Sequence, residues 1–599
     1  MSSLPTKTTA APAKPGDFTA DHRTLVLALM ALAIGSGGAG AAWVLIKLIA
    51  LVTNLTWFGT VSVANIPLSQ ATRGPWMVLA PAVGGLVIGL MARFGSEKIR
   101  GHGIPEAIEA ILIGGSRMSP KVAVLKPVSS AISIGTGGPF GAEGPIIMTG
   151  GAIGSLFAQC FHLSAAERKT LLVAGAAAGM TAIFGTPIAA VLMAVELLLF
   201  EWKPRSFIPV AVAAIVSITW RPLLFGTGPL FPYPTDPHLP LWGLGLCVCV
   251  GILSGLQSGL LTTLLYKLED LFEHLPVHWM WWPVIGGLIV GAGGLIEPRA
   301  LGVGYDVIAD LLNGSMDARS ALAILLVKAA IWLIALASGT SGGVLAPLLI
   351  LGGALGWLLG LVLPGDPAFW ALLGMAGMMG GTMRSPLTGT LFAVELTGNV
   401  HVLAPLIAAT VAAFCVTVLL LKRSILTEKI ARRGQHITRE YSIDPYELTR
   451  VSEVMTRSVD TLPAEMPVSE ALAFFMRHDH RHRMYPIVDS AGKLVGAATR
   501  ADALRWRMEG EHEARTIYDA VSDISIPVAH SDEIVARVAD RMVVGDVGRV
   551  PVVERETGKL VGLLARKDLI QMRAASSSLE QDRKAYYLRP RRSDGATSK

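Results

Sequence analysis

Charged residues and cysteines are scarce in this chain, and each shortage excludes classes of protein. Only 16% of its 599 residues are Asp, Glu, Lys or Arg, whereas 52% are hydrophobic, and the mean hydropathy is +0.53. A chain of this composition is not a water-soluble globular protein. Because the apolar excess is confined to residues 24–421, we expect an integral membrane protein there, followed by a soluble region.

Other absences exclude particular kinds of site. Two of the four cysteines, Cys247 and Cys249, lie in the apolar run LGLCVCVGIL, which indicates buried small side chains rather than a metal or redox pair. The stretch HDHRH (478–482) has no second cluster of ligands beside it, so we expect a solvated basic turn and no metal. No nucleophile with a base and no phosphate loop stands at a convincing spacing, so no enzyme is expected. The net charge of +6 comes without a basic stripe, which argues against a nucleic-acid partner.

The two ends of the chain predict its orientation. Residues 1–22 are rich in Thr, Ala, Pro and Lys and lack an apolar core, so they predict a disordered cytoplasmic segment rather than a cleaved signal peptide. Lysines and arginines crowd the sequence directly after Leu421, which places the C-terminus in the cytoplasm as well. The charged, Ser-rich stretch 574–599 predicts a disordered tail.

The apolar region divides at the polar connector Gly226–Pro240 into similar halves, about 23–225 and 240–433. The sequence GTPIAAVLMAVEL, which begins at Gly185, returns as RSPLTGTLFAVEL 199 residues later, and a glycine-rich stretch before a proline recurs 202 residues on. These matching offsets indicate a duplication. Several runs are broken by Gly and Pro, which predicts tilted or re-entrant helices. Spans or partial spans are expected near 25–55, 76–93, 121–134, 146–161, 170–200, 207–225, 241–265, 281–295, 321–338, 344–363, 368–381 and 387–421.

One stretch, Gly135–Gly150, has a single carboxylate within a region that is apolar enough to lie in a membrane. It reads GTGGPFGAEGPIIMTG, and its acid is Glu143. A carboxylate at membrane depth is costly, so it indicates an ion path or an ion pair. Pro145 can begin a helix whose positive N-terminal end faces the membrane interior. This arrangement suits a permeating anion.

Two further stretches share this design, GHGIPE (101–106) and GGVLAP (342–347). Three helix N-termini with free glycine backbone can together surround one dehydrated anion. The set of motifs is similar to the CLC family of chloride channels and chloride/proton exchangers, over roughly residues 24–433. The resemblance implies a homodimer with one pore per subunit. It also implies an all-α polytopic membrane fold of about eighteen helices in two inverted repeats.

In that family the glutamate of the second stretch is the gate and competes with chloride for the outer site; here it is Glu143. The resemblance also implies the anion-binding positions, which are His102, Gly103, Ile104, Phe140, Gly141, Ala142, Gly144, Val344, Leu345 and Leu426.

Three of these positions depart from the family pattern. His102 stands where the family usually has Ser. Its imidazole either donates to the central anion and makes binding pH-sensitive, or turns away and leaves the donors to Gly103 and Ile104. Leu426 replaces the family's tyrosine, so a coordinating hydroxyl is missing there, and Leu345 replaces a phenylalanine.

The inner proton relay of the family's exchangers also departs from the pattern, because Leu197 stands where they carry a glutamate. Glu196 is expected to be structural, since Glu395 holds the equivalent place in the other half. Glu201 is the remaining candidate, although the residues after it indicate the membrane interface. Lys126 either raises the potential for anions or is an interfacial snorkelling lysine.

The soluble region contains a second duplication. RMYPIVDSAGKLVGAATRADAL (483–504) resembles RVPVVERETGKLVGLLARKDLI (549–570), and each predicts a strand, turn, strand and helix. The pair resembles α/β CBS domains, expected at 451–510 and 517–573. This implies regulation by ATP, ADP or AMP at Thr499, Asp502 and Asp568, with at most one intact site because Ala565 replaces the second hydroxyl. A pair that only dimerises is the alternative.

These features predict a chloride channel in a bacterial inner membrane, with voltage- or pH-dependent passive conduction gated by Glu143 and no required cofactor. The alternative is a chloride/proton antiporter in which water or Glu201 carries the inner proton. A fluoride or nitrate specialist is a third reading that rests on His102, and the intact Glu-Gly-Pro motif at 143–145 disfavours fluoride.

Overall fold

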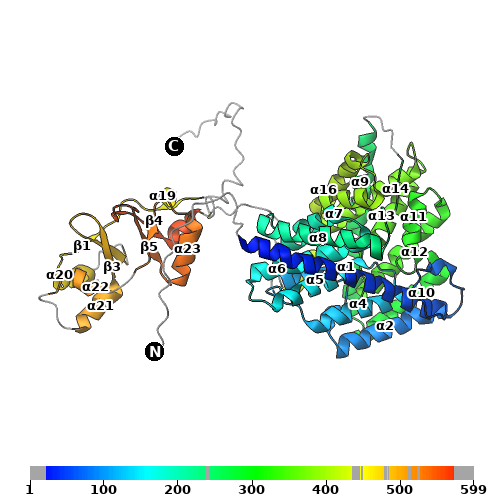
Figure 1. The fold of residues 1–599 in the computed structure, drawn as a ribbon, viewed down its shortest axis with the longest axis horizontal. Coiled ribbons are helices and arrows are strands. Elements are labelled where there is room, and N and C mark those ends of the chain that lie inside the picture. Colours follow the sequence, from blue (N-terminus) through cyan, green and yellow to red (C-terminus); the bar gives the residue numbers. More distant parts are fainter. Residues whose placement is uncertain are drawn as a thin grey trace, which may run out of the picture. The chain divides into compact units, whose positions relative to one another are not determined.

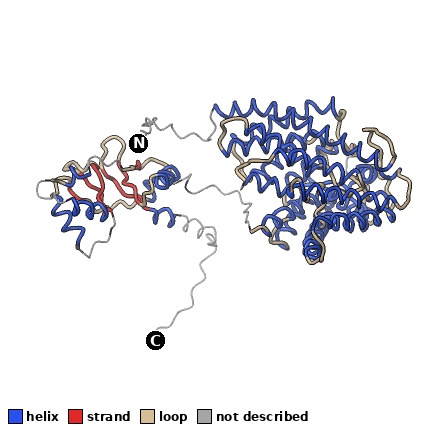
Figure 2. Tube along the Cα trace, turned by 90° about the horizontal axis from the view of Figure 1, so that it is seen from below, coloured by secondary structure: helices blue, strands red, loops and turns tan. Residues whose placement is uncertain are grey.

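A computed structural model describes residues 22–112, 114–235, 242–434, 446, 449–477, 482, 484–509, 515–521 and 526–572. The chain forms two compact units, divided between Glu440 and Tyr441. Strands occur only in the second unit among the described residues (Figures 1 and 2). The expected disordered ends and the HDHRH stretch lie outside the described residues, except for His22, which begins the first helix, and His482.

The described part of the first unit contains two sets of eight α-helices and a final short helix (Figure 1). The first set is α1 (His22–Trp57), α2 (Trp76–Phe94), α3 (Ile104–Leu112), α4 (Pro120–Gly135), α5 (Glu143–Gln159), α6 (Ala165–Phe184), α7 (Pro187–Met193) and α8 (Pro204–Leu224). The second set is α9 (Gly243–Glu273), α10 (Trp282–Ile296), α11 (Tyr305–Leu312), α12 (Ala318–Ala337), α13 (Leu345–Gly360), α14 (Pro367–Met383), α15 (Pro386–Thr397) and α16 (Leu403–Leu420), and α17 (Ile425–Arg432) follows. Short 3₁₀ turns are η1 (Leu68–Gln70), η2 (Glu97–Ile99), η4 (Trp279–Trp281) and η5 (Pro298–Ala300).

Packing between helices repeats in the two sets. Helix α5 packs on α6 as α13 packs on α14, and α1 packs on α8 as α9 packs on α16. These contacts are close because the helices meet at glycines: a Cβ added to Gly154 would lie 2.1 Å from the carbonyl oxygen of Leu171, and one added to Gly356 would lie 2.1 Å from that of Trp370. Small residues at helix contacts are the usual solution inside membranes. The duplication predicted from the sequence is therefore confirmed.

Two of the expected apolar runs are each divided into two helices. The run at 170–200 turns at Gly185, where φ is +72°, and the run at 387–421 turns at Gly398, where φ is +70°. Glycine adopts this left-handed conformation without the cost that a Cβ brings. Helix α7 continues into the π-helical turn η3 (Ala194–Leu199). Among the described residues, seven helices are long and apolar enough to cross a membrane.

The second unit contains two similar three-stranded sheets. In the first, β1 (Leu462–Pro463) pairs parallel with β2 (Met484–Val488), which pairs antiparallel with β3 (Leu494–Thr499). In the second, β4 (Ala529–His530), β5 (Arg549–Val553) and β6 (Leu560–Ala565) repeat this order. The helices include α19 (Val451–Val454), α20 (Val468–Met476), α21 (Arg500–Glu509), α22 (Ile517–Val521) and α23 (Val535–Val544), and residues 566–572 are helical as well.

The two cores of this unit exchange short segments. Val451 of α19 is buried in the core of the second sheet, whereas Ile517 and Val521 of α22 are buried in the core of the first. Each short helix therefore buries its apolar face on the sheet of the other copy.

Candidate functional site

The three glycine-rich stretches of the first unit meet in space, each directly before a helix. Gly101 forms an isolated parallel bridge with Ser341, and Gly141 forms an antiparallel bridge with Gly343. In the second bridge the Gly141 N–H donates to the Gly343 carbonyl at 3.1 Å and the Gly343 N–H returns the bond at 2.8 Å. Helices α3, α5 and α13 start within a few residues of these bridges, so their unpaired N–H groups and positive ends come together.

Close backbone contact at this junction requires glycine. A Cβ added to Gly144 would lie 2.0 Å from the carbonyl oxygen of His102, and a Cβ added to Gly342 would lie 2.3 Å from the ring of Phe140. Real Cβ atoms do not approach other atoms so closely. The glycines of the motif therefore allow three chain segments to pack around one point.

Glu143 is the carboxylate at this point. It is the first residue of α5 and is fully buried. Neither carboxylate oxygen has a hydrogen-bond partner among the described residues, although the N–H groups of Ala346 and of Glu143 itself face it. A Cβ added to Gly343 would lie 2.7 Å from Oε2, so the side chain fills the space between the second and third stretches. A buried carboxylate without a partner is costly.

The N–H groups predicted to bind an anion are not all available. Phe140 donates its N–H to Gly138 at 2.8 Å, and Gly141 donates to Gly343 at 3.1 Å. In this structure the N–H groups of these two residues are thus bonded within and between the loops. The remaining predicted positions are Gly103, Ile104, Ala142, Gly144, Val344 and Leu345, which lie at the starts of α3, α5 and α13.

His102 lies in the loop before α3 and is 3% exposed. Its Nδ1 is buried without a hydrogen-bond partner among the described residues. The residue lines a cavity of about 520 Å³ together with charged side chains that include Arg100, Glu269, Lys429 and Arg433. We call this cavity the vestibule.

Lys429 of α17 stands at the end of the vestibule that is nearest the glycine junction. A Cβ added to Gly101 would lie 2.5 Å from its Nζ, and this Nζ also lies 2.9 Å from Oε1 of Glu106. The sequence pointed to α17 only through Leu426, which is buried in the apolar core. Spacing along α17 gave no signal that Lys429 reaches the junction.

Lys126 joins two of the three stretches. Its side chain is fully buried, and Nζ donates to the carbonyls of Ile99 and Gly101 at 2.8 and 2.7 Å and to Oγ of Ser341 at 3.0 Å. The interfacial snorkelling reading of Lys126 is therefore wrong, because all three donor positions are used inside the protein. The contribution of Ser341 was not predicted, since a single serine in a glycine-rich loop carries no distinguishing pattern.

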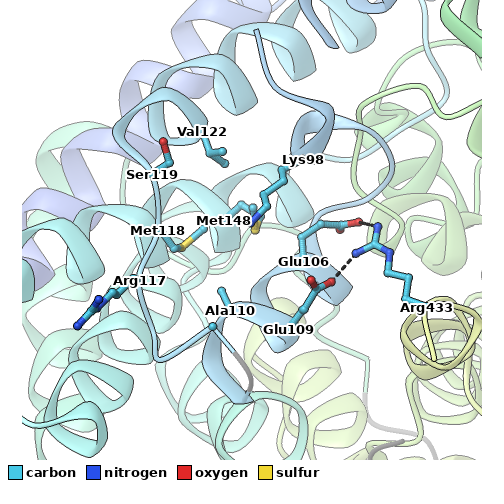
Figure 3. A pocket seen from close by; sticks show the side chains of 11 residues that line it. Lys98, Glu106, Glu109, Ala110, Arg117, Met118, Ser119, Val122, Met148 and Arg433 are labelled. Atoms are coloured by element: carbon cyan, nitrogen blue, oxygen red, sulfur yellow. Dashed lines mark hydrogen bonds and ion pairs between the residues drawn. The ribbon is translucent and has the colours of Figure 1, made fainter. Parts of the chain in front are cut away.

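A second, smaller cavity of about 130 Å³ lies beside α3. Figure 3 shows Arg433 reaching toward both Glu106 and Glu109 at its edge. Arg433 lies 3.3 Å from Glu106 Oε1 and 2.5 Å from Glu109 Oε2. These pairs hold α17 against α3, the helix that follows His102.

Carboxylates near the expected proton path are engaged elsewhere. Leu197 is fully buried in η3. Glu196 accepts from the N–H and hydroxyl of Thr388 at 2.9 and 2.6 Å, so it caps the start of α15. Glu201 accepts from Ser206 Oγ at 2.7 Å and lies 3.9 Å from Lys169.

Tyr305, at the start of α11, was not predicted. Its hydroxyl is buried without a partner among the described residues, and it lines a cavity of about 280 Å³. Its ring packs edge-on against Phe231 at 5.8 Å.

The predicted nucleotide residues of the second unit cap helices. Asp502 accepts from the N–H and hydroxyl of Thr499 at 2.9 and 2.6 Å, and its other oxygen accepts from Arg505 at 3.0 Å. Asp568 accepts from the N–H of Ala565 at 2.8 Å. No group of three or more potential metal ligands occurs in the part of the chain that the structure describes.

Comparisons with known proteins agree with this architecture. Residues 84–418 match the family model of the voltage gated chloride channel, and residues 451–509 and 521–574 match the CBS domain. The voltage-gated ClC-type chloride channel ClcB of Escherichia coli O81 is 31% identical over 60% of this chain and 88% of its own length. The H(+)/Cl(-) exchange transporter ClcA of Salmonella arizonae is 29% identical over 65% of this chain and 84% of its own length.

Solved structures share the fold. The crystal structure of a slow cyanobacterial Cl⁻/H⁺ antiporter has a TM-score of 0.60 and 23% identity and covers 69% of this chain and 99% of its own. A eukaryotic CLC transporter has a TM-score of 0.57 and 19% identity over 91% of this chain and 98% of its own. The fold class predicted from the sequence is thus confirmed. The chain belongs to the voltage-gated chloride channel (CLC) family of integral membrane anion transporters, with two CBS domains after the membrane unit.

Proposed function

We propose that this protein exchanges chloride for protons, with Glu143 as the gate. The observation that carries the proposal is the buried, unpaired carboxylate of Glu143 between helix N-termini. Chloride would need the same N–H groups, so the anion and the ionised side chain exclude each other from this place. A carboxylate that leaves the anion site when it is protonated, and returns when it loses the proton, couples the movement of chloride to the movement of protons.

The names of similar proteins support chloride/proton exchange more than passive conduction, which was the main prediction from the sequence. Similar proteins are named as exchange transporters, and one similar structure is that of an antiporter. The passive channel remains the second candidate. The observation in its favour is Leu197, a fully buried leucine at the family's inner proton position.

Reconstitution into liposomes separates the two candidates. We expect an outward chloride gradient to drive protons uphill in a fixed ratio, recorded with a chloride electrode and a pH-sensitive dye. Chloride efflux without uphill proton movement would establish the channel instead. Repeating the assay with fluoride and nitrate tests the anion, and we expect chloride to be transported faster than fluoride because the Glu-Gly-Pro motif is intact.

Assembly and orientation complete the proposal. We assign a homodimer with one ion path per subunit in a bacterial inner membrane, with both ends of the chain in the cytoplasm. The basic residues of α17, which line the vestibule, support a cytoplasmic opening for this cavity. Cross-linking in liposomes should give a dimer, and a strictly monomeric transporter would contradict the assignment.

Regulation by an adenine nucleotide is assigned to the first CBS copy. What supports it is a hydroxyl and a carboxylate held together at the start of α21, Thr499 and Asp502. Asp568 of the second copy lacks the hydroxyl partner because Ala565 precedes it. Calorimetry with ATP, ADP and AMP tests this assignment: one site per chain that is lost in Asp502→Ala is expected, and no heat with any of them would leave the pair as a packing module.

A further inference from the structure

Exchange requires a group that passes protons between the vestibule and Glu143, and the expected carboxylate is missing at Leu197. The two carboxylates closest to it in sequence do not replace it. Glu196 is bonded to Thr388, and Glu201 is held by Ser206 and Lys169. The carrier must therefore be sought on another element.

His102 lies in a loop that borders both the vestibule and Gly144, the residue after Glu143. It lines the vestibule, and its carbonyl oxygen would lie only 2.0 Å from a Cβ at Gly144, the residue after Glu143. The residue thus belongs to a segment that lies against Gly144 on one side and lines the vestibule on the other. Its imidazole has two ring nitrogens, so it can accept a proton at one and release a proton from the other.

Hydrogen bonding leaves the ring available for this task. Nδ1 is buried without a partner among the described residues, whereas a purely structural histidine in a protein interior is normally bonded to a backbone group. We infer that His102 carries the inner proton in place of the carboxylate that is absent at Leu197. This inference rests on the proposed exchange.

The proton balance is simple. A hydronium ion in the vestibule gives its proton to Nε2 of His102 and becomes water. The imidazolium then releases the proton from its other nitrogen, through water, to the carboxylate of Glu143, which becomes a neutral carboxylic acid. His102 is left neutral in the other tautomer, and rotation of the ring or exchange with water restores the first.

The charges around His102 connect the proton to chloride. Lys126 from α4, Lys429 from α17 and Glu106 from α3, the helix that follows His102, act on the imidazole. An imidazolium would thus have two ammonium groups and one carboxylate as neighbours, and a chloride bound at the helix N-termini would supply a further counter-charge. Passage of the proton is therefore favoured while chloride is bound.

The test uses the full chain in liposomes and two substitutions. His102→Asn keeps an N–H donor for the anion but cannot be protonated, and His102→Ser restores the residue usual in the family. We expect both variants to elute as the wild type does, and the number of protons moved per chloride to fall about tenfold or more. The double variant His102→Ser with Leu197→Glu, which supplies a carboxylate on η3, should regain proton movement.

The outcomes separate the inference from the function on which it rests. Wild-type protein that moves no protons uphill would overturn both. Wild-type exchange that persists unchanged in His102→Asn and His102→Ser would overturn only the role of His102. Loss of coupling in Glu201→Gln, with coupling kept in the His102 variants, would assign the proton to Glu201 instead.

Discussion

Lys126 and Lys328 hold equivalent positions in the two halves of the membrane unit. Both are fully buried. Lys126 donates to carbonyls 2.8 and 2.7 Å away in the loop before α3, and Lys328 donates to carbonyls 3.0 and 3.2 Å away in the loop before α11. The first loop supports the third stretch, because Lys126 also bonds Ser341. The second loop supports the stretch that contains Glu143, because the Gly302 N–H donates to the Gly137 carbonyl at 3.1 Å.

Replacing each lysine by methionine separates these two tasks. Both variants should lose about 1–3 kcal/mol of stability, because two buried carbonyls lose their donor. Lys126→Met should also slow chloride efflux, since Lys126 adjoins His102 and bonds Ser341. Thermal inactivation followed by size-exclusion chromatography and chloride efflux measure the two effects. Equal slowing of efflux by Lys328→Met would show that the contacts of Lys126 with His102 and Ser341 do not explain the loss.

Glu143→Gln should uncouple the two ions. The amide has nearly the shape of the carboxylic acid but can neither take nor release a proton. Proton movement should fall about a hundredfold, while chloride still moves and its rate becomes independent of pH. Parallel chloride and proton recordings over a series of pH values measure this, and coupling retained by Glu143→Gln would remove Glu143 from the proton path.

Glu196 and Glu395 should affect stability and not coupling. Glu395 accepts from the N–H groups of Ile188 and Ala189 at 2.9 and 2.8 Å, as Glu196 does from Thr388. Either residue changed to Ala should cost about 1 kcal/mol, the usual effect of losing a helix cap. The proton-to-chloride ratio should stay that of the wild type, and a changed ratio in Glu196→Ala would give this residue a place in the relay.

Gly144→Ala should abolish transport. Its Cβ would lie 2.0 Å from the His102 carbonyl, and a backbone atom cannot yield as a flexible side chain can. Gly245→Ala in α9 is the matched control, because nothing lies within 4 Å of its added Cβ, and it should stabilise the protein by about 0.5–1 kcal/mol. Chloride efflux and inactivation temperature compare the two, and normal efflux in Gly144→Ala would disprove tight packing at the junction.

Local pattern was enough to predict the duplication, the three glycine-rich helix starts and the buried carboxylate, because each depends on residue types at short spacing. It was not enough for contacts between the stretches. The Gly141 N–H, which we predicted to bind an anion, donates to the Gly343 carbonyl. The buried Lys126 bonds a serine that is more than 200 residues away in the sequence. The position of a side chain such as Tyr305 depends on tertiary packing, and no periodic pattern in the sequence indicates it.

The crossed caps of Glu196 and Glu395 mean that each half carries the acceptor for a helix of the other. A half produced alone would therefore leave the start of α7 or α15 without the carboxylate that accepts from its N–H groups. Before the two halves were joined in one gene, their single-copy forerunner would have needed a second copy of itself to close the same helix ends. In the present chain, both helix-capping contacts are made within one polypeptide.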